Sequence, residues 1–380
     1  MTRPDRDPVT LRGISSRAWE HPADRGALVA LRELRGFDII LRKLASLMSE
    51  RKFRLQFLGN GIRVDRHQYA KVHQAYLQVA ATLDVEDPPE LYVTRSPDLG
   101  GLTIGIDRPI VSITSGSVAM LDDDELRFLL AHELGHAVSG HALYRSMLIW
   151  VLRLTSGLSW LPIGSVGLRI IAAALAEWQR KSELTADRAG LLAVQNPAVA
   201  TRLLARIAGG GDLSQIDIAA FLEQAKEYES GGDLRDSLIK LVMLEQMTHD
   251  VPVERAAALQ QWVGDGEYQA ILNGEYVRRD EDDSVSISAE AKEAARHYKE
   301  AFNNSSDPLA NMVRRLRDKV VPTERLCTPR APARRQLGLP FHPWTSITCA
   351  RTRTCCRRSS NTNAFGLLRY PAGRQAWHSG

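Results

Sequence analysis

One short segment constrains this chain more than any other: residues His132–His136 read His-Glu-Leu-Gly-His. On a helix, residues four positions apart lie on the same face, so His132 and His136 can bind one metal ion together. Glu133 lies beside the first histidine, where its carboxylate can accept a proton from an attacking water. The three residues before the segment and the two after it carry no charge, as expected of a helix buried against a core. The segment therefore predicts a helix that carries most of a zinc hydrolase site.

The start of this helix is marked by four consecutive acidic residues, Asp122–Glu125. Acidic residues are favoured at the first turn, where they cap free backbone N–H groups and complement the helix dipole. The metal motif then falls in the middle of the helix, where both histidines keep helical spacing.

A catalytic zinc site usually has three protein ligands, so a third has to come from elsewhere. His141 is the nearest histidine, but it does not fit the pattern with a third histidine six residues on, and Ser139 occupies the place of that pattern's glycine. We expect His141 to be a helix-end or surface histidine. Glu183 is the better candidate, with Asp187 four residues later.

Glu183 and Asp187 lie on a predicted helix from about Ala172 to Gln195, which Asn196-Pro197 would end. Two carboxylates on one face suit a metal ligand and a partner that orients a ligating histidine. From spacing alone, an ordinary solvated helix face is an equally good interpretation.

The two motifs together resemble those of the HtpX-like zinc metallopeptidases, the family that also contains the CAAX prenyl protease. The resemblance covers roughly residues 88–260. It implies one zinc ion per chain bound by His132, His136 and Glu183. It also implies that Glu133 is the general base and that Asp187 supports the site.

The chain departs from the family pattern in three places. Asp250 replaces a proline in an element containing His249 and Arg255, which leaves a role for these two at the reaction's oxyanion open. Gly100-Gly101 stands where the family commonly has Asn-Ala, so the shape of the cleft is also open. Many relatives have transmembrane helices, whereas the first ninety residues here contain no apolar run near the ~18–20 residues needed, and no signal peptide.

Residues 147–175 are the most apolar stretch between the motifs. They predict two helices, 147–154 and 166–175, joined by a Gly/Pro turn into a hydrophobic hairpin. Packing on the core or covering the cleft is the favoured interpretation, and peripheral contact with a membrane surface is the alternative.

The remaining pattern predicts an α+β fold, predominantly helical, in which a zincin-like metallopeptidase core has a small sheet beside the active-site helix. The predicted strands are 90–94, 102–106 and 110–114, and further helices are expected at 27–50, 66–83 and 288–302. The predicted domains are an N-terminal helical region at 1–87, the zinc metallopeptidase domain at 88–262, a charged linker with a C-terminal helix at 263–324, and an Arg/Cys-rich tail at 325–380.

The tail accounts for the positive net charge of +4. After Glu324 the chain has ten arginines and no acidic residue, so the rest is acidic and a nucleic-acid partner is not expected. All four cysteines also lie there, at Cys327, Cys349, Cys355 and Cys356. A disordered basic arm and a terminus translated in a shifted reading frame both fit this composition. The cysteine-free body suits a reducing compartment, so a cytoplasmic location is expected, with membrane association as the alternative.

These observations predict a zinc-dependent endopeptidase whose protein or peptide substrate lies extended beside Ile110–Thr114. Two alternatives remain: a zinc-stabilised binding protein without catalysis, and a zinc hydrolase of a non-peptide amide or ester. Glu133 argues against the first, because a purely structural site needs no base. Only the family resemblance argues against the second.

Overall fold

The computed structural model describes residues 8–32, 49–157, 165–210, 212–230 and 251–281. All of them belong to the first of the two units into which the chain divides, residues 1–323. His249, the helix expected at 288–302 and the cysteine-containing tail lie outside the described residues.

A four-stranded sheet stands at the centre of the described fold, with strand order β1-β2-β4-β3. The strands are β1 (Gly61–Arg63), β2 (Glu90–Thr94), β3 (Gly101–Ile104) and β4 (Ile110–Thr114). β2 and β4 pair in parallel, and the other two pairings are antiparallel. The predicted bounds of β2 and β4 are confirmed, and β3 lies one to two residues earlier than predicted. β4 is flanked on both sides, so the predicted substrate position beside Ile110–Thr114 is wrong. The edge strands are β1 and β3, and β3 is the one next to β4.

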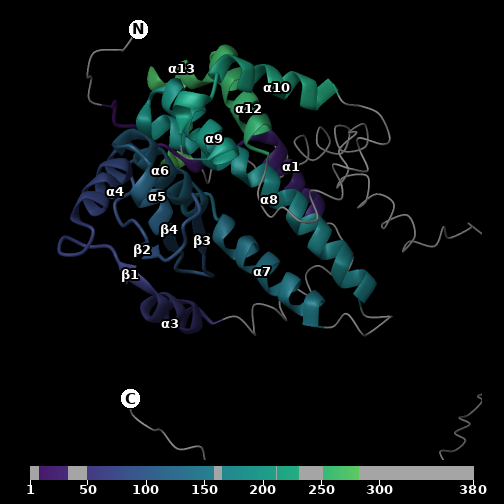
Figure 1. Cartoon of the computed structure of the whole chain (residues 1–380). Helices are drawn as coiled ribbons and strands as arrows, with labels where there is room; N and C mark the ends of the chain where they lie inside the picture. Colours follow the sequence, from purple (N-terminus) through teal and green to yellow (C-terminus); the bar gives the residue numbers. More distant parts are fainter. Residues whose placement is uncertain (1–7, 33–48, 158–164, 211, 231–250, 282–380) are drawn as a thin grey trace, which may run out of the picture. The chain divides into compact units, whose positions relative to one another are not determined.

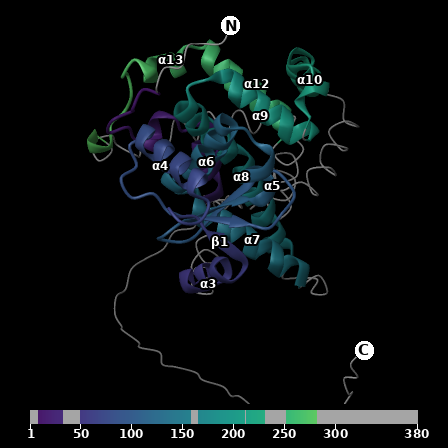
Figure 2. The same cartoon turned by 60° about the vertical axis from the view of Figure 1, so that its left-hand side comes forward.

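The two faces of the sheet pack against different helices because side chains alternate along each strand. Leu91, Val93 and Val111 join one core with α4 (Ala70–Thr82) and α6 (Asp123–Val138). Tyr92 and Ile110 join a second core, which includes α3 (Glu50–Asn60) and α7 (His141–Gly157). Figure 2 shows α4 and α3 on opposite sides of the sheet. The fold is therefore α+β and mostly helical, as predicted.

The helix that carries the motif, α6, begins as its sequence predicts. The Asp122 side chain accepts hydrogen bonds from the backbone N–H groups of Asp124 and Glu125, and the Glu125 carboxylate accepts one from Asp122 N–H. This capping box satisfies three N–H groups at the helix start. The metal motif lies in the second half of α6, where its residues are buried.

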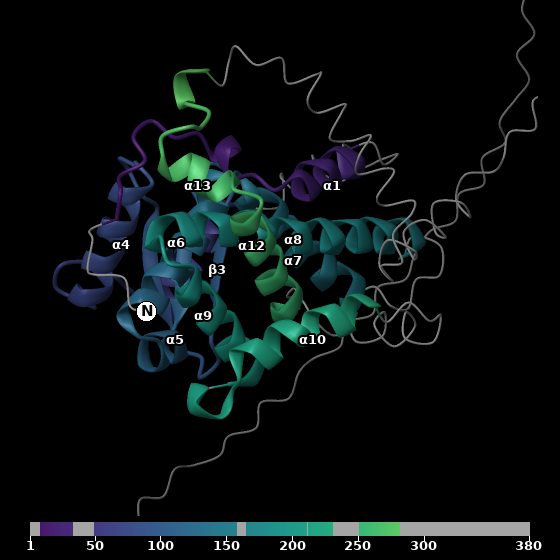
Figure 3. The same cartoon turned by 90° about the horizontal axis from the view of Figure 1, so that it is seen from above.

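The second motif lies on α8 (Ser165–Val194), one continuous helix that includes both segments predicted separately at 166–175 and 172–195. α7 and α8 run side by side, and α1 (Pro22–Arg32) lies along α8 (Figures 1 and 3). Their buried side chains include Met147, Val151, Leu175 and Trp178. The arms of the predicted hairpin therefore pack on each other, on α1 and on the sheet.

Several further helices complete the described fold. They are α5 (Ser115–Met120), α9 (Pro197–Gly209), α10 (Ile218–Ser230), α12 (Pro252–Gly264), α13 (Glu267–Leu272) and the short 3-10 helices Ser16–Ala18, Leu213–Gln215 and Arg279–Glu281. The chain after α13 returns to the N-terminal segment, where Ser15 N–H donates to Val277 O and Arg279 N–H donates to Gly13 O.

Among the helices in the described ranges, none has an apolar stretch long enough to span a bilayer.

Candidate metal centre and active site

The site is built where α6 and α8 meet, and Gly135 allows their close approach. A Cβ atom at Gly135 would lie 2.6 Å from the Cβ of Ala189 on α8. Because the histidines flank this contact on α6, the close approach brings their imidazoles to the face of α8 that carries Glu183. The close packing of α6 against α8 therefore requires a glycine at position 135.

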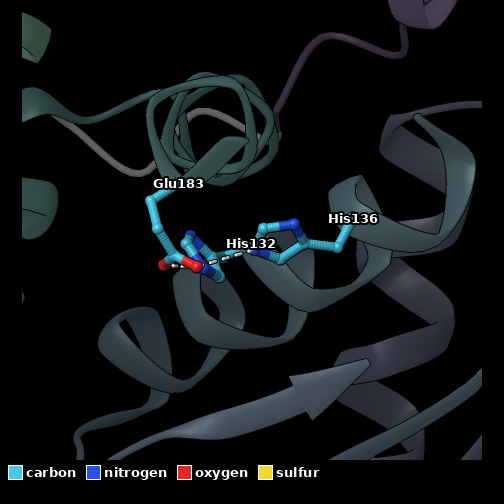
Figure 4. A group of neighbouring side chains, drawn as sticks. All are labelled: His132, His136 and Glu183. Carbon is cyan, nitrogen blue, oxygen red and sulfur yellow. Dashed lines mark ion pairs between the residues drawn. The ribbon is translucent and has the colours of Figure 1, made fainter. Parts of the chain in front are cut away.

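The side chains of His132, His136 and Glu183 meet in one buried cluster (Figure 4). One ligand atom from each residue lies within 4.8 Å of the other two. Glu183 spans the pair, with Oε2 3.3 Å from His132 Nε2 and Oε1 3.4 Å from His136 Nε2. His136 Nε2 is buried and makes no hydrogen bond within the described part of the chain. Two imidazoles and a carboxylate around such an atom fit a divalent metal ion.

The charge states of the cluster follow from these contacts. Burial would raise the pKa of Glu183, but its close contacts with the imidazoles of His132 and His136 hold that pKa well below its usual value. Burial also disfavours charge on His132, yet its bonds to Asp187 and Glu183 raise its pKa to about 9. Burial dominates at His136 and lowers its pKa well below the usual value. Glu183 is therefore an anion, and a metal ion bound by His132 would have to displace the proton of that imidazole.

Asp187 lies one turn beyond Glu183, behind the first histidine. Its Oδ1 is 2.9 Å from His132 Nδ1. Arg255 on α12 binds it through two bonds, Nε to Oδ2 at 2.7 Å and Nη2 to Oδ1 at 2.5 Å. Burial would raise the pKa of Asp187, but the charge of Arg255 lowers it. Asp187 is therefore a carboxylate that can fix the orientation of His132, and Arg255 is its ion-pair partner.

The carboxylate of Glu133 contacts the edge strand β3. Its Oε2 accepts a hydrogen bond of 2.7 Å from Thr103 Oγ1, and Arg145 Nη1 on α7 lies 3.2 Å from the same oxygen. Arg145 Nη2 is also 3.8 Å from Glu183 Oε1. The guanidinium of Arg145 therefore contacts both Glu133 and Glu183. Gly101 leaves the space for this arrangement, because a Cβ there would lie 2.6 Å from Glu133 Cγ.

Sequence reasoning missed several residues around the cluster. His141 does begin a helix, α7, but it is buried and its Nδ1 lies 2.9 Å from His136 Nδ1. Gln179 donates a 2.6 Å hydrogen bond to Glu183 Oε1, from one turn earlier on α8. Arg145 was identifiable as one of two arginines in a largely apolar helix that has no acidic residue, whereas nothing in the sequence ties Thr103 to the site.

The fold and the cluster together define a class of protein: a metallopeptidase whose two histidines and glutamate come from neighbouring helices beside a small sheet. Comparison with known proteins agrees with this class. Residues 66–263 match the model of peptidase family M48. The chain is 30% identical over 271 residues to the plastoglobule-localized metallopeptidase 48, chloroplastic, of Arabidopsis thaliana. The aligned stretch covers 70% of this chain and 78% of that relative.

A shorter stretch of 68 residues is 29% identical to the protease HtpX homolog of Helicobacter pylori (strain J99), covering 17% of this chain and 22% of that relative. No solved structure shows a significant match to the chain. The family match spans more than half of the sequence and contains both metal motifs. The chain belongs to peptidase family M48, and it is a metal-dependent hydrolase of protein or peptide substrates.

Proposed function

We propose that this metallopeptidase is a zinc endopeptidase with one ion held by His132, His136 and Glu183. Two imidazole nitrogens and one carboxylate are a common catalytic zinc set, and three protein ligands leave a position for water. The observation that carries the proposal is the buried cluster with its unbonded His136 Nε2. When bound, zinc lowers the pKa of a water towards neutrality and polarises the scissile carbonyl.

The other residues of the site transfer the proton and hold the reacting groups in position. Glu133 accepts the proton of the attacking water and delivers it to the leaving amine. Thr103 and Arg145 hold its carboxylate in one orientation beside the cluster. Asp187 accepts the hydrogen bond from His132 Nδ1, which leaves Nε2 as the atom free to bind metal.

The substrate strand is proposed to pair with β3. Thr114 N–H donates to Gly100 O at 3.0 Å, which makes Gly100 and Leu102 members of the hydrogen-bonded pairs with β4. By alternation, the backbone groups of Gly101 and Thr103 point to the other edge of the strand, where no described strand pairs with them. A peptide adding there passes beside Glu133. Further on, Ser146 of α7 binds both backbone groups of Gly105 and closes that end.

The two alternatives have less support. A binding protein with an inert zinc site has no use for a carboxylate held by Thr103 and Arg145 beside the cluster. A hydrolase of a non-peptide amide or ester would use the same residues, but the family and the free edge of β3 both favour a peptide.

Placement in the cell is also a proposal. The enzyme is proposed to be cytoplasmic and to contact a membrane surface through residues 147–175. Leu152 and Arg153, which are exposed on α7, support this contact. The name of the Arabidopsis relative places that protein at plastoglobules of the chloroplast, which supports membrane-associated or organellar placement. Flotation with lipid vesicles tests this, because Leu152→Ser should reduce the bound fraction. Equal flotation of the variant, or none of the wild type, would contradict contact through this segment.

The proposed chemistry is tested by Glu133→Gln, which removes the base without removing a ligand. The variant should keep its metal and fold while hydrolysis of unfolded casein falls by about 10²–10⁴-fold, the usual contribution of general base catalysis. Glu223→Gln, an exposed glutamate on α10, is the matched control and should be unaffected. If Glu133→Gln cleaved casein at the wild-type rate, Glu133 would not be the base. If the metal-loaded wild type cleaved nothing, the protein would not be an endopeptidase.

A further inference from the structure

The second metal-binding histidine has its own hydrogen-bond route to a buried carboxylate. His136 Nδ1 is 2.9 Å from His141 Nδ1, and His141 Nε2 is 3.0 Å from Asp24 Oδ2. All three side chains are buried. The chain of contacts leads from α6 through the start of α7 to α1. His132 contacts the carboxylate of Asp187 directly, whereas His136 reaches the carboxylate of Asp24 through the imidazole of His141.

The direction of the hydrogen bonds along this route follows from the ligand set of the proposed function, on which the inference rests. His136 Nε2 faces Glu183 and is the atom offered to the metal, so its proton is on Nδ1. His141 Nδ1 must then accept that hydrogen bond, which leaves the His141 proton on Nε2. This Nε2–H donates to the carboxylate of Asp24. Every donor therefore meets an acceptor, and the two imidazoles each hold one tautomer.

Asp24 is fixed by the same helix that carries the third ligand. Its Oδ2 also accepts a 2.7 Å hydrogen bond from Thr185 Oγ1 on α8, between Glu183 and Asp187. The ring of His141 is held edge-on against Trp178, also of α8, at a centroid distance of 5.5 Å. Asp24 precedes the region 66–263 that matches the family model. An N-terminal helix outside that region thus reaches the metal centre.

We propose that His141 and Asp24 are positioning residues for His136, and that α1 is therefore part of the metal centre. They act through His136, by holding its ring and tautomer so that Nε2 is presented to the metal. Residues that orient metal ligands in this way typically change metal affinity by about 10–100-fold when they are mutated. The effect should appear in metal binding itself, before any substrate is added.

The experiment measures the zinc dissociation constant of the full-length protein by competition with a chelator. His141→Phe keeps a ring against Trp178 but removes the acceptor, and we expect its Kd to rise by about 10–100-fold. His141→Asn restores an acceptor near the position of Nδ1 and should recover most of the affinity. Asp24→Asn weakens the acceptor at the far end and should raise the Kd by a smaller factor.

Tyr144→Phe is the matched control. It removes the hydroxyl that accepts hydrogen bonds from Arg32, a contact between α7 and α1 that does not touch a ligand. Its zinc Kd should equal that of the wild type. Thermal unfolding of each metal-free variant separates loss of fold from loss of positioning. If His141→Phe does not fold, Asp24→Asn against the same control decides the question.

Three outcomes would overturn the inference: unchanged Kd in His141→Phe, equal losses in His141→Phe and His141→Asn, or unchanged Kd in Asp24→Asn. Failure of the proposed function looks different. In that case Glu183→Gln binds zinc as tightly as the wild type, which would show that the ligand set itself is wrong.

Discussion

At the scale of single residues, Glu133 is held by more of the structure than its motif indicates. Thr103 donates to its carboxylate, Arg145 pairs with the same oxygen, and Gly101 leaves room for its methylene groups. A general base has to lie within reach of the proton it accepts, and these neighbours restrict the Glu133 carboxylate to one orientation. None of the three belongs to either metal motif.

Gly101→Ala tests this restriction. The added Cβ would meet Glu133 Cγ at 2.6 Å and Oε1 at 2.8 Å, so the carboxylate has to move out of its two hydrogen bonds. We expect kcat to fall by at least about tenfold, or ~1.4 kcal/mol in activation free energy, with metal content unchanged. Gly59→Ala, where the structure leaves open space on α3, is the control. An unaltered kcat in Gly101→Ala would show that the base tolerates displacement.

At the scale of elements, α1 begins with a cap that depends on protonation. His21 Nδ1 accepts a 3.1 Å hydrogen bond from Ala23 N–H, which requires a neutral imidazole. Burial, followed by the positive charges of Arg188 and Lys181, lowers the pKa of His21 to about 3, while Asp24 opposes the shift. The helix that carries Asp24 is therefore anchored by a histidine that the folded state keeps uncharged.

The depressed pKa of His21 predicts a pH dependence of stability. Its value is 6.5 in the reference state and about 3 in the fold, so between these values the unfolded chain binds the extra proton. The contribution of His21 is present above pH 6.5 and is lost progressively as the pH falls towards 3. His21→Asn keeps a capping oxygen without titrating. Urea unfolding of the metal-free protein should show the wild type losing free energy of unfolding relative to His21→Asn from pH 7 to pH 5. A constant difference would contradict the prediction.

Local patterns were sufficient to predict β2, β3, β4 and the helix α6, but not the short strand β1. β2 and β4 combine β-branched residues with turn signals at both ends, and the acidic residues before α6 form the cap that they predict. The two overlapping helices predicted at 166–175 and 172–195 together cover α8 to within one residue at each end, and only their continuity as one helix was not predicted. Strand order is a tertiary property, and the misplaced substrate edge followed from assuming that β4 was exposed.

At the scale of the whole molecule, segments distant in sequence complete the described fold. The chain around Val277 and Arg279 pairs with residues 13–15, and Trp19 lies fully buried nearby in sequence. Helical spacing predicted that His132 and His136 lie on one face of a helix, whereas Glu183 was predicted as a ligand from the family resemblance, because spacing alone fits a solvated helix face equally well. Asp24, Thr103 and Arg145 come from three other elements, and no spacing rule links them to the site. The predicted domain boundaries remain predictions.

Truncation after Glu324 tests the predicted independence of the tail. All proposed ligands and their neighbours lie before residue 282, and the tail lacks the apolar periodicity that could offset the entropy of ordering it. We expect unchanged metal content, peptidase activity and Tm. A fall in Tm of more than about 2 °C, the shift that roughly 1 kcal/mol causes in a domain of about 250 residues, would show that the tail contributes to the fold.

The most direct test of the central claim is anomalous scattering at the zinc edge from crystals of the zinc-loaded protein. We predict one peak per chain, within about 2.0–2.2 Å of His132 Nε2, His136 Nε2 and a carboxylate oxygen of Glu183, with Glu133 outside the ligand set. A peak bound by Glu133 or His141 in place of Glu183, or a site closed by four protein ligands, would contradict the account.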